Sequence, residues 1–496
     1  MSLVFDIVVA LLSLASYLRW LRVAQREHYE PGRVLAIVGL WVRASGINGA
    51  ALFLVLLGCI ISLGDPLVGV VFAVWWLLWP HGLALVGPRR LTFTARVKRL
   101  AAVVVGIHVI AAVVLSLNDA ISILPPMTVL IVEIGLLVTR PIENRYARAW
   151  QVRAAEKLRR VSPRVVAITG SYGKTSTKNY AAHLMAGRWS TLASPASFNN
   201  AMGLSRAVND RLEPGTDVFV AEMGTYGPGE IAALVKNFPP DVSAITTIGE
   251  AHLERMKRRE VIVRAKSEIL PPAGTVVLNV DVPELAKIAD ELSATKRVIR
   301  CSATAGTAAD VSLVGTTLTV DGQPYEVTLP ADVDHPTNVA IAVGLALAVD
   351  VPVDTIVSRL SGIPATPHRA EATRREDGLV VIDDTFNSNP TGAAAALKRA
   401  ESLAGPDGII WTITPGMVEL GDEQFARNAE FARAATATPR HRLCVVGRTN
   451  RKALLSGDKT RTYLYPSREA AATHVMREVS AGDVVLYEND LPDHYA

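Results

Sequence analysis

Cysteine is scarce in this sequence. The 496 residues contain three, Cys59, Cys301 and Cys444, at spacings that fit neither a metal-ligating cluster nor a disulfide framework. Net charge is scarce too, because 51 basic residues face 47 acidic ones and leave only +4. Without a basic stripe or interleaved aromatic residues, this charge gives no support to a nucleic-acid partner. We therefore expect a chain in a reducing compartment that binds no nucleic acid.

Apolar residues are abundant, and they are concentrated before residue 140. Half of all residues are hydrophobic. Five apolar stretches approach the roughly 20 helical residues that cross a bilayer core. They cover residues 3–18, 47–63, 66–86, 100–117 and 121–139. The first stretch lacks the basic start and the small-residue cleavage site of a signal peptide, so we expect it to be a retained anchor.

The connections between these stretches predict a topology. Arginine and lysine are frequent between the first and second stretches and between the third and fourth, whereas the other two connections have none. Because these residues collect on the cytoplasmic side, we expect a multi-pass plasma-membrane protein. Its amino terminus would lie outside, and everything after Arg140 would lie in the cytoplasm.

Polar and aromatic residues within the apolar stretches are candidates for special roles. Trp75, Trp76 and Trp79 are expected near a membrane interface. An ionisable group at membrane depth, such as His108 or Glu133, is a functional candidate by default. Glu133 either serves such a function or reaches water at the cytoplasmic end, and neither residue is assigned a role.

A glycine-rich loop stands about a third of the way along the chain. The β-branched run 165–168 leads into Gly-Ser-Tyr-Gly-Lys-Thr-Ser and then into a helical pattern. In such a loop the backbone N–H groups turn toward phosphates, a lysine reaches the outer phosphates and a hydroxyl meets magnesium. The loop is shorter than the usual pattern, because Ile168 stands where its first glycine would be, so an incidental glycine turn is the alternative. The nucleotide-binding candidates are Gly170, Ser171, Gly173, Lys174, Thr175 and Ser176.

Further along, short buried strands deliver more candidate ligands. The run 218–221 ends in Glu222, and a carboxylate at the carboxyl end of a strand beside a phosphate loop can hold magnesium directly or through water. His252 and Lys266 follow a third run, 242–246. Taken alone, His252 is typical of a capping or surface histidine and Lys266 of a solvated helix residue.

Nine segments, in order, resemble signatures of the Mur ligases. They are GSYGKTST (170–177), SFNNAMGL (197–204), EMGTYGPGEI (222–231), DVSAITTIGEAHLERM (241–256), RAKSEIL (264–270), HPTNVAIA (335–342), PHRAE (367–371), VIDDTFNSNP (381–390) and GMVELGDE (416–423). The likeness covers roughly residues 160–485 and is strongest to the branch that adds D-alanyl-D-alanine to the peptidoglycan precursor. It implies an ATP-dependent ligase that forms an amide bond through an acyl phosphate.

The resemblance also implies roles for particular residues. Lys174 would contact the β- and γ-phosphates of ATP, and two Mg²⁺ ions would be held, one by Thr175 and Glu222 and the other by His252. Lys266 matches a lysine that takes up CO₂ to become a carbamate, an anionic oxygen ligand. The remaining matches are Asn338 and Asp384 for the nucleoside, Arg369 for the γ-phosphate, and Asn199, Asn200, Asn387 and Asn389 for the substrate side. His335 stays unassigned, because "HPTN" departs from the family's spacing.

These observations predict three domains. Residues 1–145 would form a transmembrane region of about five helices, and residues 146–363 a P-loop ATP-binding central domain. From residue 364 to 496, strands at 379–382, 409–414, 443–446 and 484–487 alternate with helical stretches, which predicts a Rossmann-like C-terminal ligase domain. The fold class is thus an α-helical transmembrane region followed by α/β structure.

Two departures from the family bear on the substrates. The apolar region stands where the family has a domain that grips a UDP-linked sugar, so we expect a carboxylate acceptor that is lipid-linked or close to the membrane, with membrane lipids and envelope-biosynthesis proteins as partners. Near the end, Glu488, Asp490 and Asp493 replace a basic segment. Either this acidic tail suits an amine-rich donor, or it is an ordinary solvated terminus.

Other functions stay open. A poly-γ-glutamate-type synthetase is the second ligase hypothesis, disfavoured by the segments 222–231 and 251–256. A silent membrane scaffold is disfavoured because the magnesium and phosphate positions are filled. A P-loop transporter subunit is disfavoured because the second signature of such pumps is missing.

Overall fold

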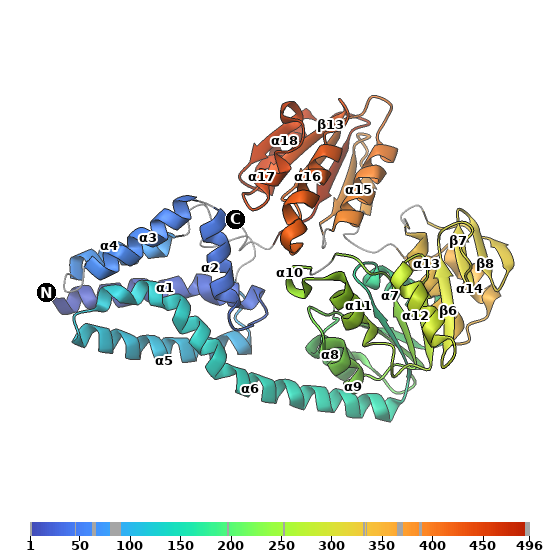
Figure 1. Ribbon diagram of the computed structural model, residues 1–496, viewed down its shortest axis with the longest axis horizontal. Coiled ribbons are helices and arrows are strands. Elements are labelled where there is room, and N and C mark those ends of the chain that lie inside the picture. Colours follow the sequence, from blue (N-terminus) through green and yellow to red (C-terminus); the bar gives the residue numbers. More distant parts are fainter. Residues whose placement is uncertain are drawn as a thin grey trace. The chain divides into compact units, whose positions relative to one another are not determined.

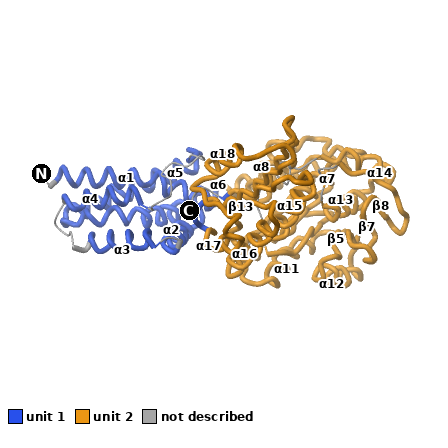
Figure 2. The backbone as a smooth tube through the Cα atoms, turned by 90° about the horizontal axis from the view of Figure 1, so that it is seen from above, with its two compact units in different colours: residues 1–146, 447–449, 491–496 blue, residues 147–446, 450–490 orange. Residues whose placement is uncertain are grey.

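The computed structural model describes residues 2–44, 46–61, 66–79, 91–195, 198–250, 253–330, 333, 335–364, 371–385 and 389–491. It forms two compact units (Figure 2). The first consists mainly of the residues up to Tyr146, and the second of residues 147–446 and 450–490. Each unit has a hydrophobic core of its own, so each is described separately below.

In its described residues the first unit contains helices joined by short loops and no strand. Its helices are α1 Ser2–Arg26, α2 Arg33–Ala44, α3 Gly46–Ile61, α4 Pro66–Leu78, α5 Ala95–Leu117, the short η1 Ile121–Ile123 and α6 Leu124–Val161. By length and composition, three described helices could cross a membrane, in residues 3–26, 95–117 and 121–161. A fourth span results if Arg33–Arg43 and Gly46–Cys59, bent by 116°, count as one. Within the described residues, three or four helices thus meet the length and composition of a span, whereas the sequence predicted five.

One expected stretch is shorter than predicted, and one helix was not expected. The stretch predicted as 66–86 is helical as far as Leu78, and a helix of 13 residues spans only about 20 Å. Residues 80–90 lie outside the described part of the chain. Helix α2 was not expected, because Arg33 and Arg43, which it contains, were assigned to the connection between the first two apolar stretches.

The core of the helical unit contains a cluster of tryptophans. Trp20, Trp41, Trp76 and Trp79 are each no more than 2% exposed, and Trp76 stacks on Trp79 with ring centroids 5.0 Å apart. The Nε1 of Trp76 donates to the hydroxyl of Thr128 at 2.9 Å. Of the three tryptophans expected at a membrane interface, only Trp75 has a large exposed surface. Trp76 and Trp79 are buried because they pack inside the helical unit.

Glu133 and His108 have structural partners. The Glu133 carboxylate accepts hydrogen bonds from the backbone N–H groups of Gly32 at 2.6 Å and Leu35 at 3.0 Å. These groups lie at the start of α2, where the first N–H groups of a helix lack intrahelical partners. His108 contacts the hydroxyl of Tyr17 at 3.1 Å. Glu133 thus caps a helix and does not need to reach water.

The second unit contains two sheets covered by helices (Figure 1). The larger sheet has nine strands in the order β2-β3-β1-β4-β5-β6-β7-β8-β9, parallel from β2 to β7 and antiparallel from β7 to β9. Its strands are β1 Arg164–Thr169, β2 Thr191–Ala193, β3 Val218–Glu222, β4 Val242–Ile245, β5 Thr275–Asn279, β6 Arg297–Ser302, β7 Val311–Val314, β8 Thr317–Val320 and β9 Gln323–Glu326. Its helices are α7 Lys174–Met185, α8 Ala201–Arg211, α9 Glu230–Asn237, α10 Leu253–Met256, α11 Arg259–Ser267, α12 Pro283–Leu292, α13 Pro336–Ala348 and α14 Val353–Leu360.

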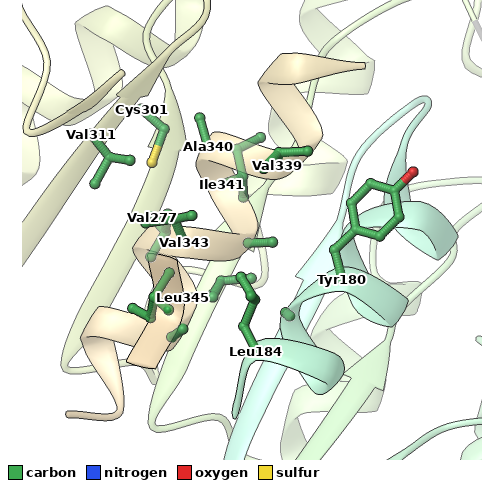
Figure 3. Packing of buried hydrophobic residues seen from close by; sticks show 14 of the residues in the cluster. Tyr180, Leu184, Val277, Cys301, Val311, Val339, Ala340, Ile341, Val343 and Leu345 are labelled. Atoms are coloured by element: carbon green, nitrogen blue, oxygen red, sulfur yellow. The ribbon is translucent and has the colours of Figure 1, made fainter. Parts of the chain in front are cut away.

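Alternation along the strands produces two cores, one on each face of this sheet. In β1, Val166 and Ile168 face the cluster that contains α7 and α13, whereas Val165 and Ala167 face the cluster on the other side. Successive side chains of a strand point to opposite faces, so a strand covered on both sides reads as a continuous apolar run. Figure 3 shows α13 packed between the strands and α7, with Tyr180 among its neighbours. This packing fixes the position of α7, whose first residue is Lys174.

The smaller sheet has six strands in the order β10-β11-β15-β12-β13-β14, all parallel except β10. The strands are β10 Glu371–Arg374, β11 Val380–Asp384, β12 Ile410–Thr414, β13 His441–Val446, β14 Thr462–Tyr465 and β15 Val484–Glu488. The helices are α15 Pro390–Leu403, α16 Gln424–Ala434, α17 Arg451–Leu454 and α18 Arg468–Glu478, with the short η2 Gly421–Glu423 and η3 Lys459–Arg461. The strands expected after residue 364 are present, in an α/β layer.

Candidate functional site

The glycine-rich loop joins β1 to α7, and two of its glycines are required by the geometry. Gly170 has a φ of +152°, and a Cβ there would lie 1.9 Å from the hydroxyl oxygen of Thr246. Gly173, at φ +79°, precedes α7, and a Cβ there would lie 2.3 Å from Oδ1 of Asn338. Among the described residues, no side chain forms a capping hydrogen bond at the start of α7. The first N–H groups of a helix lack intrahelical partners, so this end of α7 suits an anion.

Lys174 and Ser171 shape this loop from within. The Lys174 ammonium donates to the backbone carbonyl oxygens of Gly170 at 2.8 Å and Ser171 at 3.2 Å, so its charge lies over the loop. The Ser171 hydroxyl accepts the backbone N–H of Gly249 at 2.9 Å. Ser171 thus braces the loop against the segment after β4, and Ser176 is buried in α7.

Glu222 is the centre of a buried polar cluster at the carboxyl end of β3. One carboxylate oxygen accepts from the Thr175 hydroxyl at 2.9 Å and from the Lys178 ammonium at 3.3 Å, and the other accepts from the Asn199 side-chain amide at 3.1 Å. Thr175 and Glu222, expected to share a magnesium ion, are in contact. Asn199, expected on the substrate side, contacts this carboxylate.

Sequence reasoning missed Lys178. Its side chain is 1% exposed and forms a buried ion pair with Glu222, whose side chain is 2% exposed. A buried carboxylate is costly unless a charge or hydrogen bonds compensate it. The available signal was helical spacing, because Lys178 lies one turn beyond Lys174 on the face of α7 that also carries the buried Ala181 and Met185.

Lys266 is buried at the end of α11, so the hypothesis of a solvated helix residue is wrong. The residue is 2% exposed. Burial lowers the pKa of its amine well below the usual range, and the positive charge of Lys174 lowers it further. A lowered pKa favours the neutral form of the amine, and only a neutral amine can attack CO₂.

The donor set at Glu222 suits magnesium. Mg²⁺ prefers oxygen ligands, and in nucleotide sites it uses one or two carboxylates together with phosphate oxygens and water. The Thr175 hydroxyl and the Glu222 carboxylate supply such oxygens. In the part of the chain that the structure describes, no three His, Cys, Asp or Glu side chains cluster to hold a metal alone. These residues therefore fit an ion that shares its ligands with a nucleotide.

The remaining predicted site residues fall into two groups. His252, Arg369 and Asn387 lie outside the described residues. Asn200 and Asn389 both cap helices, because their Oδ1 atoms accept the backbone N–H of Gly203 at 2.9 Å and of Gly392 at 2.8 Å. Asn338 lies beside Gly173, as described above, and Asp384 ends β11.

Glu488, the first acidic residue of the tail, is not exposed to solvent. This residue is 0% exposed and lies opposite Asp384 in the register of β11 and β15. Burial raises the pKa of Glu488 to about 8, the hydrogen bond from the Thr414 hydroxyl opposes that rise, and Asp384 adds to it. Asp490 forms an ion pair with Arg468 at 3.4 Å, and Asp493 lies outside the described residues. Glu488 therefore offers no exposed charge to an incoming amine.

The parallel sheet carries a glycine loop between β1 and α7, and a carboxylate ends the neighbouring strand β3. These features define a nucleotide-binding α/β protein of the P-loop type. Two family models match the same regions: residues 168–346 match the Mur ligase middle domain, and residues 368–487 match the Mur ligase, glutamate ligase domain. The chain belongs to the Mur ligase family, whose members are ATP-dependent amide ligases that use Mg²⁺.

Curated relatives agree with this assignment. The chain is 34% identical over 342 residues to the UDP-N-acetylmuramoyl-tripeptide–D-alanyl-D-alanine ligase of Mycobacterium tuberculosis (strain CDC 1551 / Oshkosh), covering 65% of this chain and 66% of the relative. It is 32% identical over 365 residues to the enzyme of the same name from Mycobacterium leprae (strain TN), covering 65% of this chain and 70% of the relative. The chain thus spans about two thirds of the length of these relatives.

Solved structures share the fold. A crystal structure of MurF from Acinetobacter baumannii is similar with a TM-score of 0.60 and 25% identity, covering 69% of this chain and 77% of that one. MurF ligase from Thermotoga maritima, solved in complex with ADP, has a TM-score of 0.60 and 23% identity, with coverages of 69% and 80%. The similarity therefore extends over most of each known structure.

Gly173→Ala should weaken ATP binding about tenfold or more. The substitution forces an L-residue into a left-handed conformation, at a cost of roughly 1–3 kcal/mol, and it also drives a methyl group into Asn338. Gly215→Ala is the matched control, because Gly215 has a φ of +90° but no neighbouring atom within 4 Å of an added Cβ. Titration of a fluorescent ATP analogue should show weaker binding for Gly173→Ala only. Equal affinities would exclude a role of this loop in nucleotide binding.

Proposed function

We propose that this chain is a membrane-anchored ATP-dependent ligase that joins a carboxylate to an amine on a cell-envelope precursor. The observation that carries the proposal is the convergence of the Thr175 hydroxyl and the Glu222 carboxylate, 2.9 Å apart, beside the glycine loop. Residues 146–363 would bind ATP, and residues 364–496 would bring the amine. A non-catalytic scaffold gives no reason for this arrangement, whereas a transporter ATPase would also use it, so the acceptor dependence of ADP release separates a ligase from a transporter.

Each polar group of the loop has a task in such a reaction. A carboxylate oxygen attacks the γ-phosphorus of ATP, ADP leaves, and the amine then displaces phosphate from the acyl carbon. Negative charge builds on the phosphoryl oxygens, where the Lys174 ammonium and the N–H groups at the start of α7 can stabilise it. Thr175 and Glu222 would hold the first magnesium ion, which supplies positive charge when bound. His252 would serve a second ion, and Arg369 would reach the γ-phosphate from the last domain.

Lys266 would act as a carbamate. Its neutral amine adds to the carbon of CO₂, and the proton released goes to solvent. The anionic product would carry oxygen atoms in place of an ammonium, which relieves the repulsion from Lys174 that lowers the pKa of the free amine. A carbamate oxygen is also a better magnesium ligand than a lysine nitrogen. Burial at 2% exposure supports this role, because it favours the neutral form of the amine.

The acceptor we propose is lipid-linked. The first unit is helical and apolar in its described residues, with three or four helices that fit a bilayer. The catalytic unit would face the cytoplasm, where ATP is. With three spans the amino terminus would then lie outside, and with four it would lie inside. Peptidoglycan precursors are the first candidates, because the relatives are named for one, and poly-γ-glutamate synthesis is the alternative.

The reaction intermediate gives a direct test. Hydroxylamine captures acyl phosphates as hydroxamates, so the purified full chain with ATP, Mg²⁺ and a lipid extract should form a hydroxamate on a lipid-linked carboxylate. ADP release should require that acceptor. ADP release of equal rate without any acceptor, and without hydroxamate, would instead indicate an ATPase that moves or remodels something.

A further inference from the structure

The last third of α1 contains a charged group in an unusual setting. From Trp20 to Ala24 every residue is at most 5% exposed, so the helix is covered on all sides there. Arg19, at the start of this stretch, is 1% exposed. On the first half of the same helix, apolar side chains such as Leu3 and Leu11 are more than half exposed. A cation thus lies inside the helical unit.

The hydrogen bonds of Arg19 are incomplete. Its Nη2 donates to the backbone carbonyl of Leu77 at 2.9 Å, at the end of α4. Its Nε and Nη1 are buried, and neither has a partner within the part of the chain that the structure describes. The indole nitrogen of Trp20 is in the same situation. A buried unsatisfied donor costs roughly 1–3 kcal/mol, and more when it is charged.

No carboxylate of the described residues forms an ion pair with Arg19. Three acidic side chains of the helical unit have other partners: Glu133 accepts from the start of α2, Glu27 from Arg33 at 2.6 Å, and Asp6 from Ser116 at 2.5 Å. The next cation on the same face of α1 is Arg22, which is 2% exposed. The unsatisfied groups at Arg19 and Trp20 are all donors, next to a second positive charge, and this combination calls for an anion with several acceptor oxygens.

Aromatic rings enclose this part of α1. The Trp20 ring lies 5.7 Å from that of Trp41, 5.9 Å from Trp76 and 6.4 Å from Trp79, and the guanidinium carbon of Arg19 lies 5.9 Å from the Trp20 ring. Apolar walls exclude water and strengthen the attraction between a guanidinium group and an anion. The planar guanidinium fork matches the oxygens of a phosphate in a two-bond geometry.

We propose that Arg19, with Trp20 and Arg22, binds a phosphoryl oxyanion, supplied by the phosphate or diphosphate of a lipid headgroup. Arg19 stands seven residues before Arg26, the end of α1, and this corresponds to about 10 Å along the helix. That depth places the group near the headgroup level if α1 crosses a bilayer. The lipid source rests on the proposed membrane location, whereas the oxyanion site rests on the helical unit alone and is independent of the ligase chemistry.

The tryptophan cluster is a built-in reporter for this site. We expect short-chain phosphatidic acid to change the intrinsic tryptophan fluorescence of the detergent-purified full chain in a saturable way, at least tenfold more tightly than short-chain phosphatidylcholine. Arg19→Gln should weaken the binding of phosphatidic acid tenfold or more. Arg43→Gln is the matched control, because Arg43 is an exposed arginine of the same unit and its loss should change nothing.

A second measurement separates ligand binding from a purely structural role of Arg19. If Arg19 only caps α4, Arg19→Gln lowers the melting temperature equally with and without lipid. The proposal instead predicts that phosphatidic acid raises the melting temperature of the wild type and not that of Arg19→Gln or Arg19→Lys. Inorganic diphosphate, tested in place of the lipid, distinguishes a lipid headgroup from a free anion as the source of the oxyanion. A saturable response to diphosphate supports the oxyanion site and assigns the site to a free anion. No saturable response to either compound in the wild type overturns the proposal, whether or not the variants fold.

Discussion

Replacing Lys174 with alanine is expected to slow ATP-dependent ligation on the order of 100-fold or more, as for the loss of one group that stabilises transition-state charge. The ammonium lies over the glycine loop and contacts the carbonyl oxygens of Gly170 and Ser171. In the proposed reaction it would neutralise charge on the phosphoryl oxygens. Initial rates of ADP release in the presence of acceptor and amine measure the effect.

The control for Lys174→Ala is Lys236→Ala, because Lys236 is an exposed lysine of the same unit. Its loss should leave the rate within a factor of two of wild type. Circular dichroism should show that both variants are folded and melt cooperatively. A Lys174→Ala variant with the wild-type rate would remove the loop from the mechanism.

Replacing Lys266 with methionine is also expected to lower the ligation rate on the order of 100-fold or more. Methionine has nearly the same shape but cannot form a carbamate, so the buried site loses an anionic oxygen ligand. Added short-chain carboxylates should partly restore the rate by supplying such an oxygen. Labelling with ¹³CO₂ should give a carbamate signal for the wild type that Lys266→Met lacks.

Lys266→Met should also change how stability depends on pH. Burial lowers the folded-state pKa of this amine below its unfolded-state value. Between the two pKa values the unfolded chain therefore binds one more proton, and the free energy of unfolding rises with pH. Urea denaturation in CO₂-free buffer should show that Lys266→Met is more stable than wild type at low pH, by a margin that shrinks as pH rises through this window.

Lys287→Met provides the comparison, since the Lys287 side chain is 79% exposed and its removal should give no such pH-dependent difference. A Lys266→Met variant that keeps the wild-type rate would contradict the carbamate. A stability difference that does not vary with pH would contradict a lowered pKa.

The glycine loop and Glu222 were predictable because each follows from a local sequence pattern. The loop could be recognised from its glycines, and Glu222 from its place after a buried strand. Parallel strands bring their carboxyl ends to one edge, so the contact between Glu222 and Thr175 follows from the topology. Lys178 was missed because a lysine on a helix is ordinarily solvated, and only tertiary packing shows that it is buried.

The helical unit was less predictable. Apolar stretches give the positions of α1, α5 and α6, but not where a helix ends or bends. The interior positions of Arg19 and Glu133 could not be inferred, because sequence alone does not show which neighbours satisfy a charged group. The same holds for Glu488, whose acidity suggested a solvated tail while β15 carries it into the smaller sheet.

The most direct test of ligase activity is mass spectrometry of a membrane-lipid extract incubated with the purified chain, ATP, Mg²⁺ and a mixture of amines. We predict a lipid-linked species heavier by one amine less one water, formed together with ADP and absent with Lys174→Ala. Consumption of ATP with no new amide on any lipid-linked carboxylate would contradict it.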